Sequence, residues 1–222
     1  MNELGAAFHQ AIELVITFDA ELAEIVGLSL QVSLFAVAVA AAIAYPLGAM
    51  LAVGRYRGRR LAIAILNSLM GLPPVVVGLL VYLMLSRSGP LGVLGLLYSP
   101  TAMVIAQVIL VVPIIAAITR QTIEDLHREY DEQLRAFGLN AWAAIPTLLW
   151  DARSSLVTAL LAGFGRAIAE VGAVLIVGGN IDHVTRVMTT AIALETSKGN
   201  LALALGLGLV LMFIAVTING AA

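Results

Sequence analysis

The sequence lacks cysteine and is poor in charge. Its 222 residues contain no cysteine, so disulfide frameworks, thiolate metal sites and cysteine nucleophiles are excluded. Only 12% of the residues are charged, against about 25% in soluble domains, while 61% are hydrophobic. The formal net charge of −2 argues against a nucleic-acid partner, which needs a basic surface. The composition excludes a soluble globule and indicates an integral membrane protein.

Enzyme signatures are also absent. There is no G-x-x-x-x-G-K-[ST] loop for phosphate, no H-E-x-x-H pair and no G-x-S-x-G elbow. The three histidines, His9, His127 and His183, stand apart and give no metal-ligand spacing. We therefore expect no catalytic residue, no metal and no cofactor on this chain.

Long apolar runs predict an all-α protein with five transmembrane helices. Each span needs about 20 residues to cross about 30 Å of hydrocarbon. We expect spans at roughly 25–53, 61–85, 101–119, 154–178 and 201–219, in a single membrane domain of residues 1–222. The first span is rich in small residues, which favours either close helix packing within the chain or a subunit interface. These residues are Ala36, Ala38, Ala40, Ala41, Ala42, Ala44 and Gly48.

Arginines gather in two of the predicted loops, and loops near the spans retain positive charge on the cytosolic side. They are Arg55, Arg57, Arg59 and Arg60 in the first loop, and Arg120, Arg128, Arg135 and Arg153 in the third. The opposite side has only Arg87, Arg186 and Lys198. With five spans, this distribution places the N-terminus outside and the C-terminus in the cytoplasm.

Residues 1–20 predict an interfacial helix on the outer membrane surface. Its apolar face consists of Leu4, Phe8, Ala11, Ile12, Val15 and Phe18. The alternative is a frayed tail or an extra turn on the first span. Asp19 is placed to cap the helix that follows.

The longest loop, residues 124–152, lies between the third and fourth predicted spans and mixes both charge signs with helix-forming residues. We expect a surface helix, a turn at Gly138, which tolerates a left-handed backbone, and a short second helix. The apolar anchors at this turn are Phe137, Leu139, Trp142 and Ile145. Such anchors suit docking into a groove on a partner protein, and the alternative is contact with the membrane surface.

Glu132, followed by Gly138 six residues later, resembles the start of the EAA loop of importer permeases in the ATP-binding-cassette (ABC) superfamily. In that family the loop is a cytosolic coupling helix that contacts the ATPase. The resemblance implies a docking segment from Glu132 to Pro146. Its implied contact residues are Glu132, Ala136, Phe137, Gly138, Leu139, Asn140 and Trp142. Where the family continues with Ile-x-Leu-Pro, this chain reads Leu148-Leu149-Trp150-Asp151.

Further motifs, spread over nearly the whole chain, are similar to those of the molybdate and tungstate permeases. They are GLPPVVVG at 71–78, SGPLG at 88–92, AEVGA at 169–173 and GGNI at 178–181. The segment 184–199 is most similar to the tungstate branch. The resemblance implies the five-helix fold of a type I ABC importer permease.

Pro73 and Pro74 fall in the middle of the second predicted span. Two missing N–H donors leave carbonyls that protein or a water-lined path must satisfy within the membrane. The pattern favours a broken helix beside a translocation path, and the alternative is a packed structural kink.

Arg166 and Glu170 stand four residues apart in the fourth predicted span and would share one helix face. Ionisable groups inside a membrane are costly and usually face a bundle interior or an aqueous path. We expect this pair, with Gly172 of the AEVGA motif, at the path or gate. The alternative is a purely structural ion pair.

The predicted outer loop before the fifth span offers neutral side-chain donors to an oxyanion. The polar residues are Asn180, Thr185, Thr189 and Thr190, and we place Asn180 and Thr189 at the path or gate. Ordinary turn and capping roles are the alternative.

The expected function is that of a permease subunit that moves an oxyanion into the cytoplasm of a prokaryote through its inner membrane. The resemblance implies tungstate, with molybdate or sulfate as alternatives. It further implies a second copy of this chain, two ABC ATPase subunits that hold ATP and magnesium, and an extracytoplasmic tungstate/molybdate-binding protein. A rival is an ion-coupled secondary carrier with Glu170 as its proton site.

Overall fold

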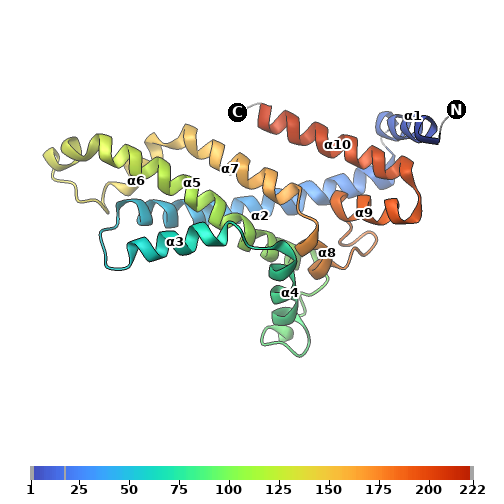
Figure 1. The fold of residues 1–222 in the computed structure, drawn as a ribbon, viewed down its shortest axis with the longest axis horizontal. Helices are drawn as coiled ribbons and strands as arrows, with labels where there is room; N and C mark the ends of the chain where they lie inside the picture. Colours follow the sequence, from blue (N-terminus) through green and yellow to red (C-terminus); the bar gives the residue numbers. More distant parts are fainter. Residues whose placement is uncertain (1–2, 18, 221–222) are drawn as a thin grey trace. The chain divides into compact units, whose positions relative to one another are not determined.

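The computed structural model describes residues 3–17 and 19–220, and every regular element in these ranges is a helix (Figure 1). In chain order the helices are α1 (Glu3–Ile16), α2 (Ala20–Val53), α3 (Arg59–Leu69), α4 (Pro74–Leu85), the 3-10 helix η1 (Gly92–Leu94), α5 (Pro100–Ala136), α6 (Ile145–Asp151), α7 (Arg153–Ile168), α8 (Gly172–Gly178), α9 (Met188–Lys198) and α10 (Leu201–Gly220). The predicted all-α class is confirmed. Phe18, assigned to the apolar face of residues 1–20, lies outside the described residues.

Contacts divide the chain into two compact units. Unit 1 takes its described residues from 1–35, 74–107 and 168–221, and unit 2 from 36–73 and 108–167. The helices α2 and α5 each contribute residues to both units.

Among the described residues, three helices, α2, α5 and α10, are long and apolar enough to cross a membrane. The number rises to five if α3 with α4, and α7 with α8, each form one interrupted span. The five predicted spans fall on these helices. The broken helix predicted from Pro73 and Pro74 within 61–85 is confirmed, whereas the expectation of one continuous helix at 154–178 is wrong. The backbone N–H of the first residue of a helix has no acceptor within that helix, and proline has no N–H, so Pro74 is suited to the first position of α4. The helix is interrupted before it, at residues 70–73.

The end of the third predicted span is also different from the expectation. The helix α5 does not stop at residue 119 but continues to Ala136. No glycine or proline interrupts the sequence between Pro113 and Gly138, and Glu124 forms ion pairs one turn away in both directions, with Arg120 and Arg128. The membrane-crossing part and the predicted surface helix are therefore one continuous element.

In unit 2, small residues bring α2 close to α5. Ala36, Ala40, Ala44 and Gly48 follow one another at intervals of four, and all are buried. A Cβ added to Gly48 would lie 2.6 Å from the carbonyl oxygen of Ala116 in α5. This face of α2 therefore packs within the chain, whereas Ala38 and Ala42 on another face are exposed.

In unit 1, α10 packs against both α1 and α9, and α4 packs against α8. Ala11 of α1 is fully buried, and a Cβ on Gly206 of α10 would approach its carbonyl oxygen to 3.5 Å. Part of the face that we expected to meet the membrane thus contacts α10, while Phe8 and Ile12 remain exposed. The predicted cap is confirmed, because Asp19 Oδ1 accepts hydrogen bonds from the N–H groups of residues 21 and 22.

Helix α9 occupies part of the predicted outer loop, so that loop is shorter than expected. The first N–H groups of a helix need partners from outside it. The N–H of Met188 donates to Ser29 Oγ of α2 at 2.7 Å, and the N–H of Val187 donates to Thr190 Oγ1. Ser29 is far away in sequence, so no local pattern indicated this start.

The close approach of α2 to α5 predicts that Gly48→Ala destabilises the protein. The added methyl would meet the Ala116 carbonyl oxygen and Thr119 Cβ, 2.8 Å away. We expect the free energy of unfolding to fall by about 1–3 kcal/mol, measured by thermal unfolding in detergent. Gly208→Ala is the matched control, because nothing lies within 4 Å of its Cβ position, and it should be neutral or slightly stabilising. An equal loss in both variants would contradict the packing argument.

Candidate functional site

The predicted order of helix, glycine turn and short helix between spans 3 and 4 is confirmed. Gly138 has φ +72, and the N–H of Leu139 closes the end of α5 by donating to the Leu134 carbonyl at 3.0 Å. The second helix, α6, begins at Ile145 rather than directly after the glycine. Residues 137–144 form turns, in which Asn140 Oδ1 accepts from the N–H of Ala143 at 2.8 Å.

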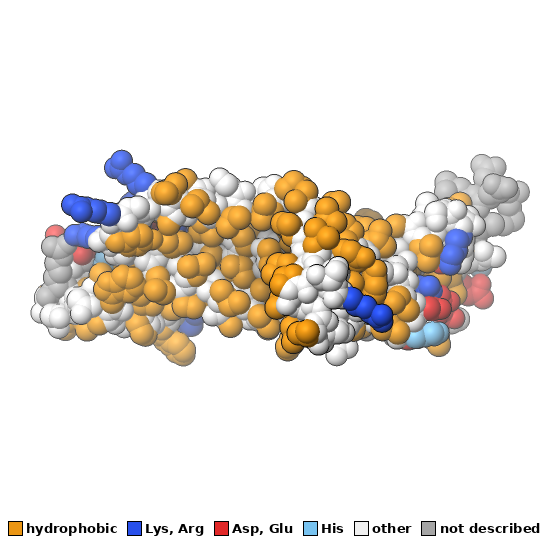
Figure 2. Space-filling model, turned by 90° about the horizontal axis from the view of Figure 1, so that it is seen from below, with side chains coloured by type: hydrophobic (Ala, Val, Ile, Leu, Met, Phe, Trp, Pro, Cys, Tyr) orange, Lys and Arg blue, Asp and Glu red, His pale blue; other side chains and the backbone are white. Residues whose placement is uncertain are grey.

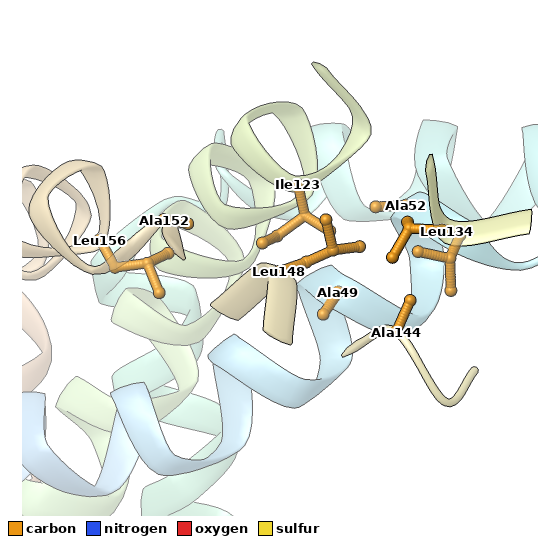
Figure 3. Packing of buried hydrophobic residues seen from close by; sticks show 9 residues of the cluster. Ala49, Ala52, Ile123, Leu134, Ala144, Leu148, Ala152 and Leu156 are labelled. Atoms are coloured by element: carbon orange, nitrogen blue, oxygen red, sulfur yellow. The ribbon is translucent and has the colours of Figure 1, made fainter. Parts of the chain in front are cut away.

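A hydrophobic cluster in unit 2 holds this loop from its inner side (Figure 3). Ala144 and Leu148 are fully buried and pack with Ile123 of α5 and Ala49 of α2. The other members of the cluster are Ala52, Val53, Leu134, Ala152 and Leu156. Burial at both ends of the turn fixes its backbone against α2 and α5.

The outer side of the loop presents aromatic and aliphatic side chains. Phe137 is 82% exposed and Trp142 52%, and Leu139 is also exposed. Glu132, Ala136 and Asn140 are exposed beside them. All seven residues assigned to ATPase coupling, with Gly138 at their centre, thus lie on one continuous segment that includes the end of α5 and the turn.

Trp150 is a candidate contact residue that the motif comparison missed. It lies in α6, is 70% exposed, and the guanidinium of Arg153 lies 5.4 Å from its ring centroid. The sequence carries only a short signal for it, an aromatic residue directly before the charged Asp151.

In unit 1, three of the predicted path residues gather at the start of α8. Glu170 is buried, and its Oε1 accepts a hydrogen bond from the N–H of Ala173 at 3.0 Å. Thr189 donates to the Glu170 carbonyl at 2.8 Å, and a Cβ on Gly172 would meet Val75 Cγ2 at 2.9 Å. Glu170, Gly172 and Thr189 are therefore held together with the first turn of α4, which begins at Pro74.

The expectation that Arg166 and Glu170 share one face of a continuous helix is wrong. Helix α7 ends at Ile168 and α8 starts at Gly172, so Glu170 lies in the break between them. Arg166 is half-buried in the last turn of α7. Both Arg166 and Pro73 belong to unit 2. In this break, the Glu170 carboxylate accepts a hydrogen bond from the N–H of Ala173, at the start of α8.

The hydroxyl groups near the outer loop donate to backbone carbonyls. Thr185 donates to the Gly178 carbonyl at 2.6 Å, and Thr190 to that of Val187 at 3.0 Å, as Thr189 does to that of Glu170. A hydroxyl has only one proton to donate. In this conformation the capping interpretation of these threonines is favoured over oxyanion binding. Asn180 is half-buried, and its Nδ2 donates to the Thr190 carbonyl at 3.4 Å.

A charged cluster in unit 1 ties the loop after α8 to the start of α2. His183 Nδ1 lies 2.9 Å from Glu24 Oε2, and Arg186 Nη1 lies 2.8 Å from Asp182 Oδ1 and 3.8 Å from Glu21 Oε1. The hydrogen bond to Glu24 raises the pKa of His183 above its ordinary value of 6.5. The ion pair between His183 and Glu24 is therefore fully formed below pH 6.5, and its contribution to stability is lost as the pH rises through the raised pKa.

This geometry predicts that Glu24→Gln lowers the pKa of His183 toward its ordinary value, because the neutral amide no longer favours the imidazolium. NMR titration of the protein with labelled histidine would measure the change. Glu21→Gln serves as the control, because Glu21 faces Arg186 rather than His183, and should shift the pKa less. A pKa of His183 that stays the same in Glu24→Gln would contradict the assignment.

Comparison with known proteins identifies the family. The model of the family described as "Binding-protein-dependent transport system inner membrane component" matches residues 44–221. The tungstate uptake system permease protein TupB of Peptoclostridium acidaminophilum is 42% identical, over 99% of this chain and 96% of its own length. A probable anion ABC transporter permease protein of Haloferax volcanii is 39% identical over 89% of this chain and 88% of its own. TupB of Campylobacter jejuni is 37% identical over 74% of this chain and 69% of its own.

The family match and the relatives agree with the all-helical fold and with the apolar helices described above. On this basis the chain belongs to the family of binding-protein-dependent transport system inner membrane components, the multi-pass permease subunits of ABC importers.

Proposed function

We propose that this chain is the permease subunit of an ATP-driven importer of tungstate. The observation that carries the proposal is the 42% identity with a tungstate uptake permease over nearly the full length of both chains. Permeases named for molybdenum, at 23% and 29% identity, and for sulfate, at 25–27%, are more distant and cover less of this chain. Tungstate is therefore favoured over molybdate and sulfate as the transported oxyanion.

The loop from Glu132 to Pro146 would dock an ABC ATPase subunit, with Trp150 as an additional contact. Its support is the combination of a fixed inner side, packed into the cluster of Figure 3, and exposed anchors on the outer side. Buried aromatic anchors surrounded by polar groups are typical of residues that dominate binding energy at interfaces. A rigid backbone also lowers the entropy that docking costs.

The assembly that we propose contains two copies of this chain, each seated on one ATPase subunit, and an extracytoplasmic protein that delivers the anion. ATP and magnesium would bind to the ATPase subunits. The arginine-rich turn at 54–60 and the loop at 120–153 would face the cytoplasm, in keeping with the positive-inside rule, and the N-terminus would lie outside. The path would pass between the two copies, near the break at 70–73, which contains Pro73 and precedes Pro74, and the break at 169–171, which contains Glu170 and precedes Gly172.

Uptake measurements test the proposed function. Proteoliposomes that contain the permease, its ATPase and the binding protein should accumulate tungstate with ATP, and uptake should fall to background when ATP is omitted. Molybdate and sulfate should compete less well than unlabelled tungstate. A secondary carrier predicts the opposite result, which is uptake by the permease alone under a proton or sodium gradient. That result would overturn the proposal.

Replacement of Gly138 by valine should uncouple ATP hydrolysis from transport. The φ of +72 strains a β-branched residue, and nothing lies within 4 Å of an added Cβ, so the effect would be on the backbone rather than on packing. We expect uptake to fall by about tenfold or more, with the protein still in the membrane. A tenfold fall corresponds to a loss of about 1.4 kcal/mol of docking free energy when the loop is misplaced. Gly138→Asn, which tolerates this conformation, should keep most of the activity.

Gly199→Val is the matched control for this variant. Gly199 has φ +81, also with nothing within 4 Å, but it ends α9 in unit 1. The same backbone strain at this position should leave ATPase coupling close to normal. Equal uncoupling by both valine variants would show general destabilisation and would contradict the role of Gly138.

A further inference from the structure

A cavity of about 570 Å³ lies in unit 2 at the turn between α2 and α3. Four arginines line it, together with His127 and one acidic residue, Glu124; they are Arg55, Arg57, Arg59 and Arg128. Its volume is within the range of about 300–1,000 Å³ typical of small-molecule sites. The excess of basic side chains makes it suited to an anion.

The single carboxylate in the cavity is already neutralised. Glu124 forms ion pairs with Arg59 at 3.3 Å and with Arg128 at 2.9 Å, and it also pairs with Arg120. Arg59 is further held in place, because its Nε and Nη2 donate to the carbonyls of Leu51 and Ala52 at the end of α2. The acidic residue therefore fixes the lining and leaves a net positive charge.

Two arginines remain for a ligand. Arg55 and Arg57 are exposed, and within 3–17 and 19–220 neither has an ion pair or a side-chain hydrogen bond. His127 adds a further polar group, because its Nδ1 is buried with no hydrogen-bond partner among the described residues. Guanidinium groups bind phosphate oxygens in a two-pronged geometry, so this lining suits a phosphate group in particular.

An apolar stripe begins directly beside the cavity. Leu61, Ile65 and Leu69 are spaced by four along α3 and are 65%, 51% and 38% exposed. Figure 2 shows basic side chains at the left-hand end of the view, where Figure 1 places the turn between α2 and α3, with hydrophobic side chains next to them. A basic pocket that continues into an apolar stripe matches the two chemistries of an anionic phospholipid, a charged headgroup and an acyl chain.

We propose that this cavity binds the headgroup phosphate of an anionic phospholipid through Arg55 and Arg57, while an acyl chain lies along Leu61, Ile65 and Leu69. The site adjoins the loop that carries the exposed anchor Trp142, because Arg55 and His127 also line a neighbouring cavity with Trp142, but Arg57 lines the proposed site alone. It does not depend on the transported anion, since any permease of this family is surrounded by lipid. A free oxyanion shares the phosphate chemistry but gives no role to the apolar stripe.

The test measures lipid binding by native mass spectrometry of the permease, assembled with its ATPase subunits in neutral detergent. The probe is dioleoylphosphatidylglycerol, compared with dioleoylphosphatidylcholine. Arg57→Gln should weaken binding of the anionic lipid by about tenfold, the loss expected when one charge-assisted hydrogen bond is removed. Arg57→Lys should retain much of the affinity. Binding of phosphatidylcholine should be the same in all variants.

Arg60→Gln is the matched control. Arg60 is exposed in the same basic segment but does not line the cavity, so its loss removes the same charge without removing a ligand group. We expect less than about a threefold effect, equivalent to less than 0.7 kcal/mol. Equal effects of Arg57→Gln and Arg60→Gln would overturn the site in favour of diffuse attraction.

Two other outcomes would also overturn the proposal. If inorganic phosphate binds as tightly as the lipid and with the same dependence on Arg57, the cavity is a site for a free anion. If the unassembled permease binds the lipid and the complex with the ATPase does not, the cavity is covered by the ATPase. A negative result in the lipid-binding experiment does not change the result expected for tungstate uptake, because the transport proposal does not require the lipid.

Discussion

The requirement that backbone polar groups be satisfied away from water dominates this structure. Two of the five predicted spans are broken, and a break frees N–H and C=O groups that lipid cannot satisfy. Around residues 70–72 the chain closes short turns onto its own carbonyls, as in the bond from the N–H of Gly71 to the Ser68 carbonyl. At the second break, Glu170 accepts from the N–H of Ala173, and Thr189 donates to the Glu170 carbonyl. The buried polar side chains of unit 1 thus make a broken helix tolerable.

The same requirement distinguishes the proposed docking loop from the proposed path region. The backbone of the turn at Gly138 is capped by local hydrogen bonds, and the side chains that pack it into the cluster of Figure 3 are apolar. The exposed apolar anchors are therefore not needed to hold the turn in place. The region around Glu170 satisfies its backbone with side chains, which restrains their movement. We infer that docking depends on backbone geometry and apolar contact. The proposed path region depends on the hydrogen bonds of Glu170 and Thr189, and opening the path would require these bonds to be replaced by others.

Periodicity and composition were sufficient to predict the all-helical class, the five apolar regions, the Asp19 cap and the turn at Gly138. These features depend on local sequence and on the length of apolar runs. The breaks were only partly predictable: two prolines mark the first, but AEVGA gives no comparable signal for the second. The start of α9 depends on Ser29 of α2, and the pairing of Arg59 with Glu124 joins residues far apart in sequence. Such long-range partners leave no local pattern.

The hydrogen bonds that threonine hydroxyl groups donate near α8 and α9 affect how the proposed importer selects its anion. Strong selection by a path needs donors that are free to bind and are left unpaired by the wrong substrate. Thr185, Thr189 and Thr190 instead donate to backbone carbonyls. A path of this kind holds the anion weakly, which favours release into the cytoplasm. We infer that discrimination between tungstate and oxyanions of the same charge rests on the protein proposed to deliver the anion, and that the permease contributes passage coupled to ATP.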